Sequence, residues 1–404
     1  MSLGALDQSQ RAKLARNSLW VCFLLLGMVS MGWVPRIPEI KDAIRLSNGA
    51  FGFVLLGSTF GSVTGAQLAG RLMHMFGSQR VIFVGVFIMP AGLAGMGLAT
   101  NAVTLFLTLY TMGLGYALID MCYNFQATVV ENILGRRYMS SFHAMWSTGA
   151  FVTTVIGGAI TRHVSPRVNL IAIAIVALIA YLIAAYYLLP PAIDGHKGEE
   201  DHESKIPLFG KSVAPLWFLG IGLLASLVGE GAASDWGAIL LRDEMGYEKG
   251  VYASAFASFA LAMIVSRFLG DRALDYFGPA KLVKLGGYLG GSLWGIAIAI
   301  AIPLSDSYPI PALVIVNLGF VAAGLGIGPM FPAFILAASK TPGVAPAVAI
   351  SRVGVIGIAG FFFGPTVTGI ISEYTNLSVG IMYPVAMLIL AGYLSKAIKR
   401  VTPA

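Results

Sequence analysis

Long apolar segments recur along the whole chain, and they constrain its fold more than any other feature. Each has about 20 or more mostly apolar residues, enough to cross about 30 Å of hydrocarbon as a helix. A membrane span must satisfy its own backbone hydrogen bonds, which favours helices. We therefore predict an all-α integral membrane protein with twelve transmembrane helices, at residues 17–40, 50–73, 79–99, 103–131, 139–162, 167–190, 213–241, 250–272, 280–303, 309–338, 343–371 and 376–398.

The distribution of basic residues predicts the orientation of these helices. If the N-terminus is cytoplasmic, most Lys and Arg fall in inside loops. The outside loops then carry only Lys41, Arg45, Arg162, Arg167, Arg242 and Lys249. This asymmetry places both termini in the cytoplasm. The net charge of +7 then reflects topology, and it gives no indication of a nucleic-acid partner. The first apolar run is too long for a signal peptide and is expected to be retained.

Little of the chain is left for a soluble domain, a metal or a cofactor. Hydrophobic residues make up 57% of the sequence and charged residues 11%. The two cysteines fall inside predicted spans, and His196 and His202 lie in a charged loop where solvation is the expected state. We expect no cofactor and no metal. That loop belongs to a flexible cytoplasmic linker, residues 191–212, between an N-terminal six-helix bundle (1–190) and a C-terminal one (213–404).

An internal repeat supports this division. The segment "GRLMHMFGSQR" (70–80) aligns with "DRALDYFGPAK" (271–281), so that Gly77 matches Gly278 and Arg80 matches Lys281. Six spans followed by six related spans predict two pseudo-symmetric bundles. Such an arrangement predicts a substrate site near the midplane between the halves and a rocking transport motion.

The first repeated segment resembles the signature loop of the major facilitator superfamily (MFS). The signature has a glycine, an aspartate four residues later, a glycine three further on and then basic residues. Here His74 stands in place of the aspartate, whereas the second copy keeps Asp275. The resemblance implies the MFS fold and a latch at the cytoplasmic helix ends, with Arg267 and Arg272 as local partners of the acids. The latch candidates are Gly70, His74, Gly77, Arg80, Arg267, Asp271, Arg272, Asp275 and Gly278. Alternatively, these charges only keep a turn in water.

Asp120 is an ionisable residue in the middle of the fourth span. A charge at that depth costs about 2.5–3.5 kcal/mol, so the side chain should face a cavity or a partner. Tyr116, Tyr123 and Asn124 share its helix face by their spacing. This polar stripe is typical of a cavity wall, and Asp120 becomes the first candidate for proton coupling. The alternative is a permanent ion pair that fixes helix packing.

The spacing of Asp120 and Asn124 after a glycine-rich run is similar to the fourth helix of fucose-permease-like MFS members. The resemblance implies that Asp120 carries a coupling proton and that Asn124 binds sugar. The proline that often follows the asparagine is Phe125 here. The segments "WVPRIPEIKDAI" and "EGAASDW" resemble a bacterial inner-membrane branch, which implies that location.

Further polar residues within spans complete the candidate set. Glu230 is a second proton-coupling candidate. Arg36 either binds substrate or pairs with Glu39, and Arg352 needs a counter-charge such as Asp120 or Glu230. Trp236 and His143 are expected near the membrane interface. The substrate-binding candidates are Asn124, Tyr116, Tyr123, Arg36, Trp33, Arg352 and Asn317.

These features favour a secondary transporter over other classes. The sequence contains no motif of a hydrolase, nucleotide-binding loop or metal centre, so we predict no enzyme activity. The leading prediction is proton-coupled symport of a small polar solute such as a sugar. A proton-coupled organic-anion carrier or a drug/proton antiporter is the alternative, and a membrane receptor is a third. Expected partners are a small-molecule substrate, protons and membrane lipid, with no nucleic acid, and the protein is expected to be a monomer.

Overall fold

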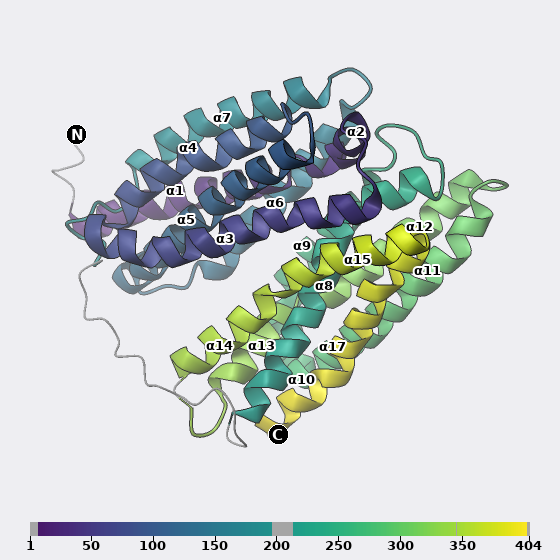
Figure 1. Ribbon diagram of the computed structural model, residues 1–404. Helices are drawn as coiled ribbons and strands as arrows, with labels where there is room; N and C mark the ends of the chain where they lie inside the picture. Colours follow the sequence, from purple (N-terminus) through teal and green to yellow (C-terminus); the bar gives the residue numbers. More distant parts are fainter. Residues whose placement is uncertain (1–6, 196–212, 345, 402–404) are drawn as a thin grey trace. The chain divides into compact units, whose positions relative to one another are not determined.

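The computed structural model describes residues 7–195, 213–344 and 346–401, and every regular element in these ranges is helical (Figure 1). The first half contains α1 (Gln8–Met31), η2 (Val34–Arg36), α2 (Ile37–Ala43), α3 (Asn48–Phe76), α4 (Ser78–Met96), α5 (Ala102–Leu134), α6 (Met139–Ala159) and α7 (Pro166–Tyr186). The second half contains α8 (Ala214–Asp243), α9 (Ser254–Phe277), α10 (Pro279–Leu285), η3 (Gly286–Gly290), α11 (Gly291–Leu304), α12 (Pro309–Ile327), α13 (Met330–Ser339), α14 (Pro346–Ile358), α15 (Gly360–Tyr374), α16 (Leu377–Gly380) and α17 (Met382–Val401).

Helical segments overlap each of the twelve predicted spans, although the bounds differ, most clearly in the first, where α1 begins at Gln8 and not at residue 17. In the described part of the chain, ten of them are long and apolar enough to cross a membrane, and α9 adds a shorter apolar stretch, Ser254–Gly270. The prediction of an all-α membrane fold is confirmed. Several helix starts carry the expected capping groups, such as Asn101, whose side chain accepts a hydrogen bond from the Thr104 amide at the start of α5.

Some predicted single spans consist of two helices. The span expected at 309–338 is divided into α12 and α13 at Gly328 and Pro329. The span expected at 343–371 is divided into α14 and α15 at Ala359. In the first case, proline supports a break because it lacks an N–H donor and clashes with the preceding turn. Such interruptions give a span a point at which it can bend.

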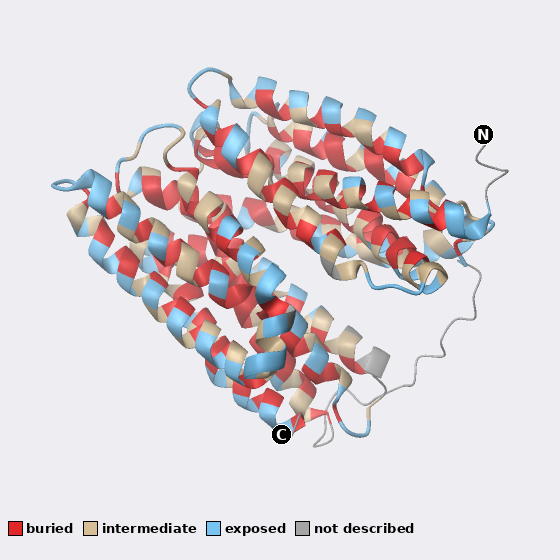
Figure 2. Ribbon diagram, turned by 180° about the vertical axis from the view of Figure 1, so that it is seen from behind, coloured by how far each residue is buried: buried red, intermediate tan, exposed pale blue. Residues whose placement is uncertain are grey.

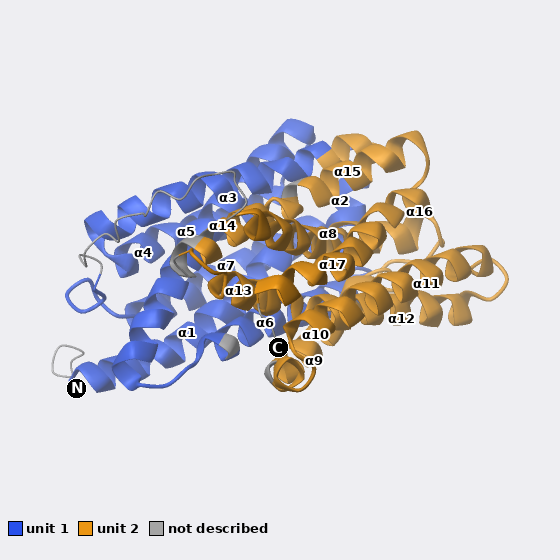
Figure 3. Ribbon diagram, turned by 90° about the horizontal axis from the view of Figure 1, so that it is seen from below, with its two compact units in different colours: residues 1–46, 53–200 blue, residues 47–52, 201–404 orange. Residues whose placement is uncertain are grey.

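The chain forms two compact units, shown in Figure 3. Unit 1 comprises residues 1–46 and 53–200, and unit 2 comprises residues 47–52 and 201–404. Inside unit 1, α5 packs on α4 and α1, and α1 packs on α6 and α7. Inside unit 2, α8 packs on α14, α15 and α17, while α12 packs on α9 and α11. Most of the predicted linker (196–212) lies outside the described residues.

Glycines bring α3 and α5 into direct backbone contact within unit 1. A Cβ atom at Gly61 would collide with the carbonyl group of Tyr110, and one at Gly113 would collide with the carbonyl of Ser58. Small residues at these positions therefore allow the close approach that membrane helices use for packing.

Large apolar side chains remain on the outer faces of the helices. On α7, Val168, Ile175, Val176, Ile179 and Ile183 are each more than half exposed. Figure 2 shows such exposed positions alternating with buried ones along the outer helices. Apolar surface on this scale is unfavourable in water and suits contact with lipid tails.

Candidate functional site

Asp120 lies near the middle of α5. At about 1.5 Å per residue it is about 27 Å from the start of the helix at Ala102 and about 21 Å from its end at Leu134. Its side chain is half-buried, as are those of Tyr116 and Asn124 on the same face. The structure thus places a carboxylate and two polar neighbours together at mid-helix.

Asn124 connects this group to the neighbouring helix. Its Nδ2 donates a hydrogen bond to the backbone carbonyl of Asp120 over 2.8 Å. Its Oδ1 lies 3.2 Å from Nε2 of His143, which is on α6. His143 therefore joins the polar group formed by Tyr116, Asp120 and Asn124. The sequence pattern had predicted that His143 lies at the membrane interface.

Tyr123 occupies a different environment from the rest of the predicted stripe. Its side chain is fully buried, and its ring packs against Phe23 of α1 with centroids 5.8 Å apart. Tyr123 is three positions from Asp120, yet its side chain faces the interior of the helix bundle of unit 1. This placement favours a packing role over contact with a solute.

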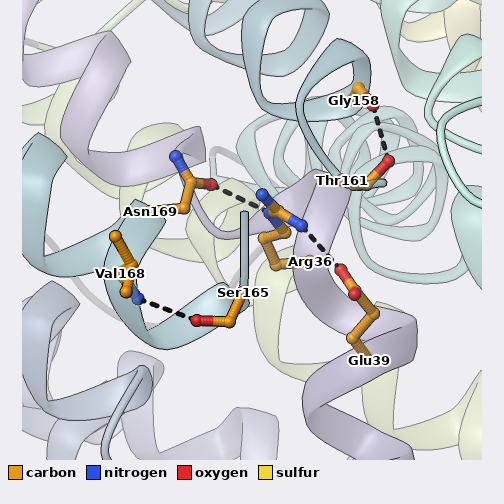
Figure 4. A network of polar contacts seen from close by, with 7 residues as sticks. All are labelled: Arg36, Glu39, Gly158, Thr161, Ser165, Val168 and Asn169. Atoms are coloured by element: carbon orange, nitrogen blue, oxygen red, sulfur yellow. Dashed lines mark hydrogen bonds and ion pairs between the residues drawn. The ribbon is translucent and has the colours of Figure 1, made fainter. Parts of the chain in front are cut away.

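Arg36 is held in a buried polar network near the turn between α6 and α7 (Figure 4). Its Nε donates to Oδ1 of Asn169 over 2.9 Å, and its Nη1 donates to Oε2 of Glu39 over 2.9 Å. The guanidinium is 0% exposed, and Trp33 beside it is 4% exposed. Of the two roles that the sequence left open, the geometry favours pairing with Glu39 over substrate binding.

Glu230 has its counter-charge within unit 2. Its Oε1 lies 3.7 Å from Nη2 of Arg267, so the pair joins α8 to α9. Both side chains are mostly buried, with exposed fractions of 12% and 26%. Arg267 was predicted as a local partner of the latch acids, and the structure adds this contact with a candidate for proton coupling.

Trp236 corrects one expectation on the same helix. It is fully buried and meets the ring of Phe51 edge-on at 5.4 Å, both within unit 2. The prediction of an interfacial anchor at this position is wrong, because an anchor would expose its ring to the interface. Its neighbour Asp235 is half-buried and accepts a hydrogen bond from Ser234 over 3.3 Å.

Asn317 and Arg352 complete the predicted substrate set in unit 2. The Asn317 amide joins α12 to α9: its Oδ1 accepts from Ser258 over 2.5 Å, and its Nδ2 donates to Ser254 over 3.1 Å. Nδ2 also donates to the carbonyl of Leu313. These bonds favour a role in helix packing. Arg352 is half-buried on α14.

The two copies of the signature loop share an unusual backbone conformation. Gly77 has φ +82° and ψ +152°, and Gly278 has φ +72° and ψ +153°. Only glycine adopts this region readily, so the backbone conformation explains why both matched positions are glycine. Each of them immediately precedes a helix, α4 or α10.

The carboxylate of Asp194, which lies more than 100 residues after the first signature loop, binds Ser78 in that loop. Oδ2 of Asp194 accepts from the backbone N–H of Ser78 over 2.8 Å and from its hydroxyl over 2.7 Å. Nε2 of Gln126 donates to Ser78 Oγ over 2.8 Å, and all three side chains are fully buried. Because Ser78 is the first residue of α4, Asp194 caps that helix. Asp194 is therefore packed within unit 1.

The remaining latch candidates lie at the surface. Gly70 and the side chains of His74, Arg80, Arg272 and Asp275 are exposed. The side chain of Asp271 lies outside the described part of the structure. His74 thus occupies an exposed position, while the acid that binds the first loop is Asp194. Sequence reasoning missed Asp194 because its segment is hydrophilic and follows a span.

A shallow cavity of about 420 Å³ opens beside this cap in unit 1. It is lined by the end of α5, the start of α1 and the segment that carries Asp194, and its apolar side chains are Phe125, Val129, Ile133 and Ile193. The cavity lies one to four helical turns beyond Asp120 in sequence, toward the end of α5.

Comparisons with known proteins agree with this architecture. The chain is 28% identical to an uncharacterized MFS-type transporter of Yersinia pestis over 381 residues, 94% of each chain. It is 23% identical to multidrug resistance protein 1 of Bacillus subtilis over 362 residues, 88% of each. Among solved structures, a point mutant of the nucleoside transporter NupG superposes with TM-score 0.76 at 13% identity, covering 95% of this chain and 99% of NupG.

A point mutant of the E. coli fucose:proton symporter FucP superposes with TM-score 0.60 at 14% identity, covering 94% of this chain and 97% of FucP. At such identities the structural likeness establishes the fold. The family profile described as Major Facilitator Superfamily matches residues 19–365. The members of this family are transporters of small molecules, not enzymes. The chain, a multi-pass membrane protein, belongs to the Major Facilitator Superfamily.

Proposed function

We propose that the protein is a proton-coupled symporter of a small, polar, uncharged solute such as a sugar or a sugar-like compound, with Asp120 as the proton carrier. The observation that carries this proposal is the half-buried carboxylate at the middle of α5, bordered by Tyr116 and Asn124. A carboxylate at membrane depth binds a proton when it is cut off from water and releases it when it is hydrated. Alternating exposure of Asp120 would therefore couple proton movement to transport.

Two arginines of the predicted spans support an uncharged solute. Arg36 is neutralised by Glu39, and Arg267 lies beside Glu230. An organic-anion carrier needs a cation that is free to bind carboxylate or phosphate. Arg36 and Arg352 are the predicted substrate-binding arginines, and Arg36 no longer favours the anion alternative because it already has a carboxylate partner. Glu230 is the second proton-binding candidate, and its protonation would release Arg267.

Two structural neighbours transport hydroxylated solutes according to their names, a nucleoside in NupG and fucose with a proton in FucP. Their names are compatible with a polar solute here. The similarity to multidrug resistance protein 1 supports a second candidate, drug/proton antiport. The polar residues around Asp120 favour the first candidate, since amphipathic compounds are bound mostly by apolar and aromatic surfaces.

We also propose how the chain is placed in the cell. The distribution of Lys and Arg supports cytoplasmic termini, and the bacterial relatives support a bacterial cytoplasmic membrane. Transport would proceed by alternating access of two bundles, residues 1–190 and 213–404, joined by the segment 191–212. A monomer is sufficient for this mechanism.

The test is proton movement in proteoliposomes that contain purified protein. Sugars, nucleosides, organic anions and cationic dyes are added in turn while the lumenal pH is recorded. We expect a neutral hydroxylated solute to drive proton uptake, and Asp120→Asn to abolish it. Asp306→Asn, at an exposed loop position, is the matched control and should behave as the wild type. Solute-driven proton uptake that persists in Asp120→Asn would exclude Asp120 as the carrier.

A further inference from the structure

The contact between His143 and Asn124 shows which nitrogen of the imidazole carries a hydrogen and how the Asn124 amide is oriented. Nδ2 of Asn124 donates to the carbonyl oxygen of Asp120, and a carbonyl oxygen accepts hydrogen bonds only. The opposite amide orientation would leave two oxygens facing each other there. Oδ1 of Asn124 therefore faces His143, and Nε2 of His143 must carry the hydrogen of the 3.2 Å contact. The neutral Nε2–H tautomer and the imidazolium both satisfy this requirement.

The imidazole ring is held independently from a third helix. Phe23 of α1 meets it at 5.2 Å between centroids with an interplanar angle of 65°, an edge-on contact. Phe23 in turn stacks on Phe142, one residue before His143, at 5.6 Å and 10°. The ring thus rests on an aromatic group shared by α1 and α6, while its Nε2 reaches across to α5.

We propose that His143 is a positioning residue of the Asp120 site: it fixes the Asn124 side chain, and with it the polar surface next to Asp120. This inference rests on the proposed function, in which Asp120 carries the proton. One consequence concerns orientation. With Oδ1 accepting from His143 and one Nδ2 hydrogen bound to the Asp120 carbonyl, the Asn124 amide presents a fixed face to Asp120 and to a solute.

Two substitutions separate the hydrogen bond from the packing of the ring. His143→Gln keeps an N–H donor of similar reach and removes the ring. His143→Phe keeps a ring against Phe23 and removes the donor. Thr148→Val is the control on α6, because the Thr148 hydroxyl donates to the backbone carbonyl of Ala144 in its own helix.

Transport is measured in proteoliposomes with the solute that drives proton uptake by the wild type. We expect His143→Gln to retain most of the wild-type rate and His143→Phe to lose about tenfold in kcat/KM, the size of one hydrogen bond to the solute-binding surface. Equal rates for His143→Phe and the wild type would overturn the inference. So would an equal loss in both variants, since that result assigns the effect to the ring.

A second measurement needs no solute. Thermal unfolding of detergent-solubilised His143→Phe, Asn124→Leu and the double variant tests whether the two residues act together. If they do, the double variant has about the Tm of the worse single variant. Additive losses would overturn the inference whatever the transport results. If the wild type moves protons with none of the solutes, the proposed function itself fails. The thermal unfolding of the single and double variants still tests the contact between His143 and Asn124, so the two failures can be told apart.

Discussion

Arg267 on α9 and Glu230 on α8 form an ion pair with 3.7 Å between Nη2 and Oε1. The pair lies within unit 2, and neither side chain is more than about a quarter exposed. Two partly desolvated charges stabilise each other, but each is unfavourable alone, because its burial is then uncompensated. This relationship predicts how single and double substitutions differ.

We expect Glu230→Gln and Arg267→Gln each to lower the free energy of unfolding by about 1–3 kcal/mol. The double variant should recover part of that loss, because it leaves no unpaired charge. Thermal unfolding in detergent measures all three. Additive destabilisation in the double variant would mean that the two charges do not interact. Proton uptake by Glu230→Gln, measured beside Asp120→Asn, then determines whether Glu230 also carries a proton.

The Arg36 network predicts a strict requirement for arginine. The guanidinium donates from Nε to Asn169 and from Nη1 to Glu39 while fully buried, and an ammonium group has neither the planar shape nor the second donor position. We expect Arg36→Lys to destabilise the protein by about 2–4 kcal/mol and Glu39→Ala by a similar amount, since each leaves a buried charge incompletely paired. Glu39→Gln should cost less, because its amide oxygen still accepts a hydrogen bond.

The measurement is the midpoint of thermal unfolding, with Lys13→Gln as the control at an exposed basic position. If Arg36→Lys and Lys13→Gln have the same midpoint, the network contributes nothing to stability. Transport by a stable Arg36 variant at the wild-type rate would further show that Arg36 does not touch the solute.

Sequence patterns predicted the helical character and approximate position of the spans, because each apolar run in a membrane must satisfy its own backbone hydrogen bonds. The breaks within spans were less accessible. Gly328 and Pro329 mark one of them, whereas the division at Ala359 is marked only by Gly357 and Gly360, and glycine is common in membrane helices without a break. Both α14 and α15 pack against α8, and such packing is not visible in a local pattern.

The candidate site shows the same limit. The mid-span position of Asp120 follows from the length of its apolar run, but the contact between Asn124 and His143 joins two helices and exists only in the folded chain. Trp236 was assigned to the interface on residue type, whereas its partner Phe51 lies 185 positions away. Asp194 was not predicted because it lies in a hydrophilic segment, where nothing in the sequence indicates that one carboxylate is fully buried.

The cap formed by Asp194 predicts a graded series of substitutions. Asp194→Ala leaves the Ser78 N–H and hydroxyl without their acceptor, and we expect a loss of about 1–3 kcal/mol in unfolding free energy. Asp194→Asn keeps an acceptor oxygen but loses the charge near the start of α4, so the loss should be smaller. Unfolding curves of both variants and of Asp306→Asn check the order. An Asp194→Ala variant as stable as the wild type would show that the cap is dispensable.

The matched glycines of the signature loops allow backbone strain to be separated from crowding. Gly77 and Gly278 share nearly the same φ and ψ, but only at Gly77 would an added Cβ meet a neighbour, lying 2.7 Å from Cβ and Cγ of Pro191. We expect Gly278→Ala to cost about 1–3 kcal/mol from the conformation alone. Gly77→Ala should cost more, because Pro191 must also move. Gly70→Ala, inside α3 with open space around its Cβ, should be neutral or stabilising by up to about 1 kcal/mol. Thermal unfolding of the three variants measures this order directly. Equal midpoints for Gly77→Ala and Gly278→Ala would mean that Pro191 moves without a cost in stability and does not restrict the loop.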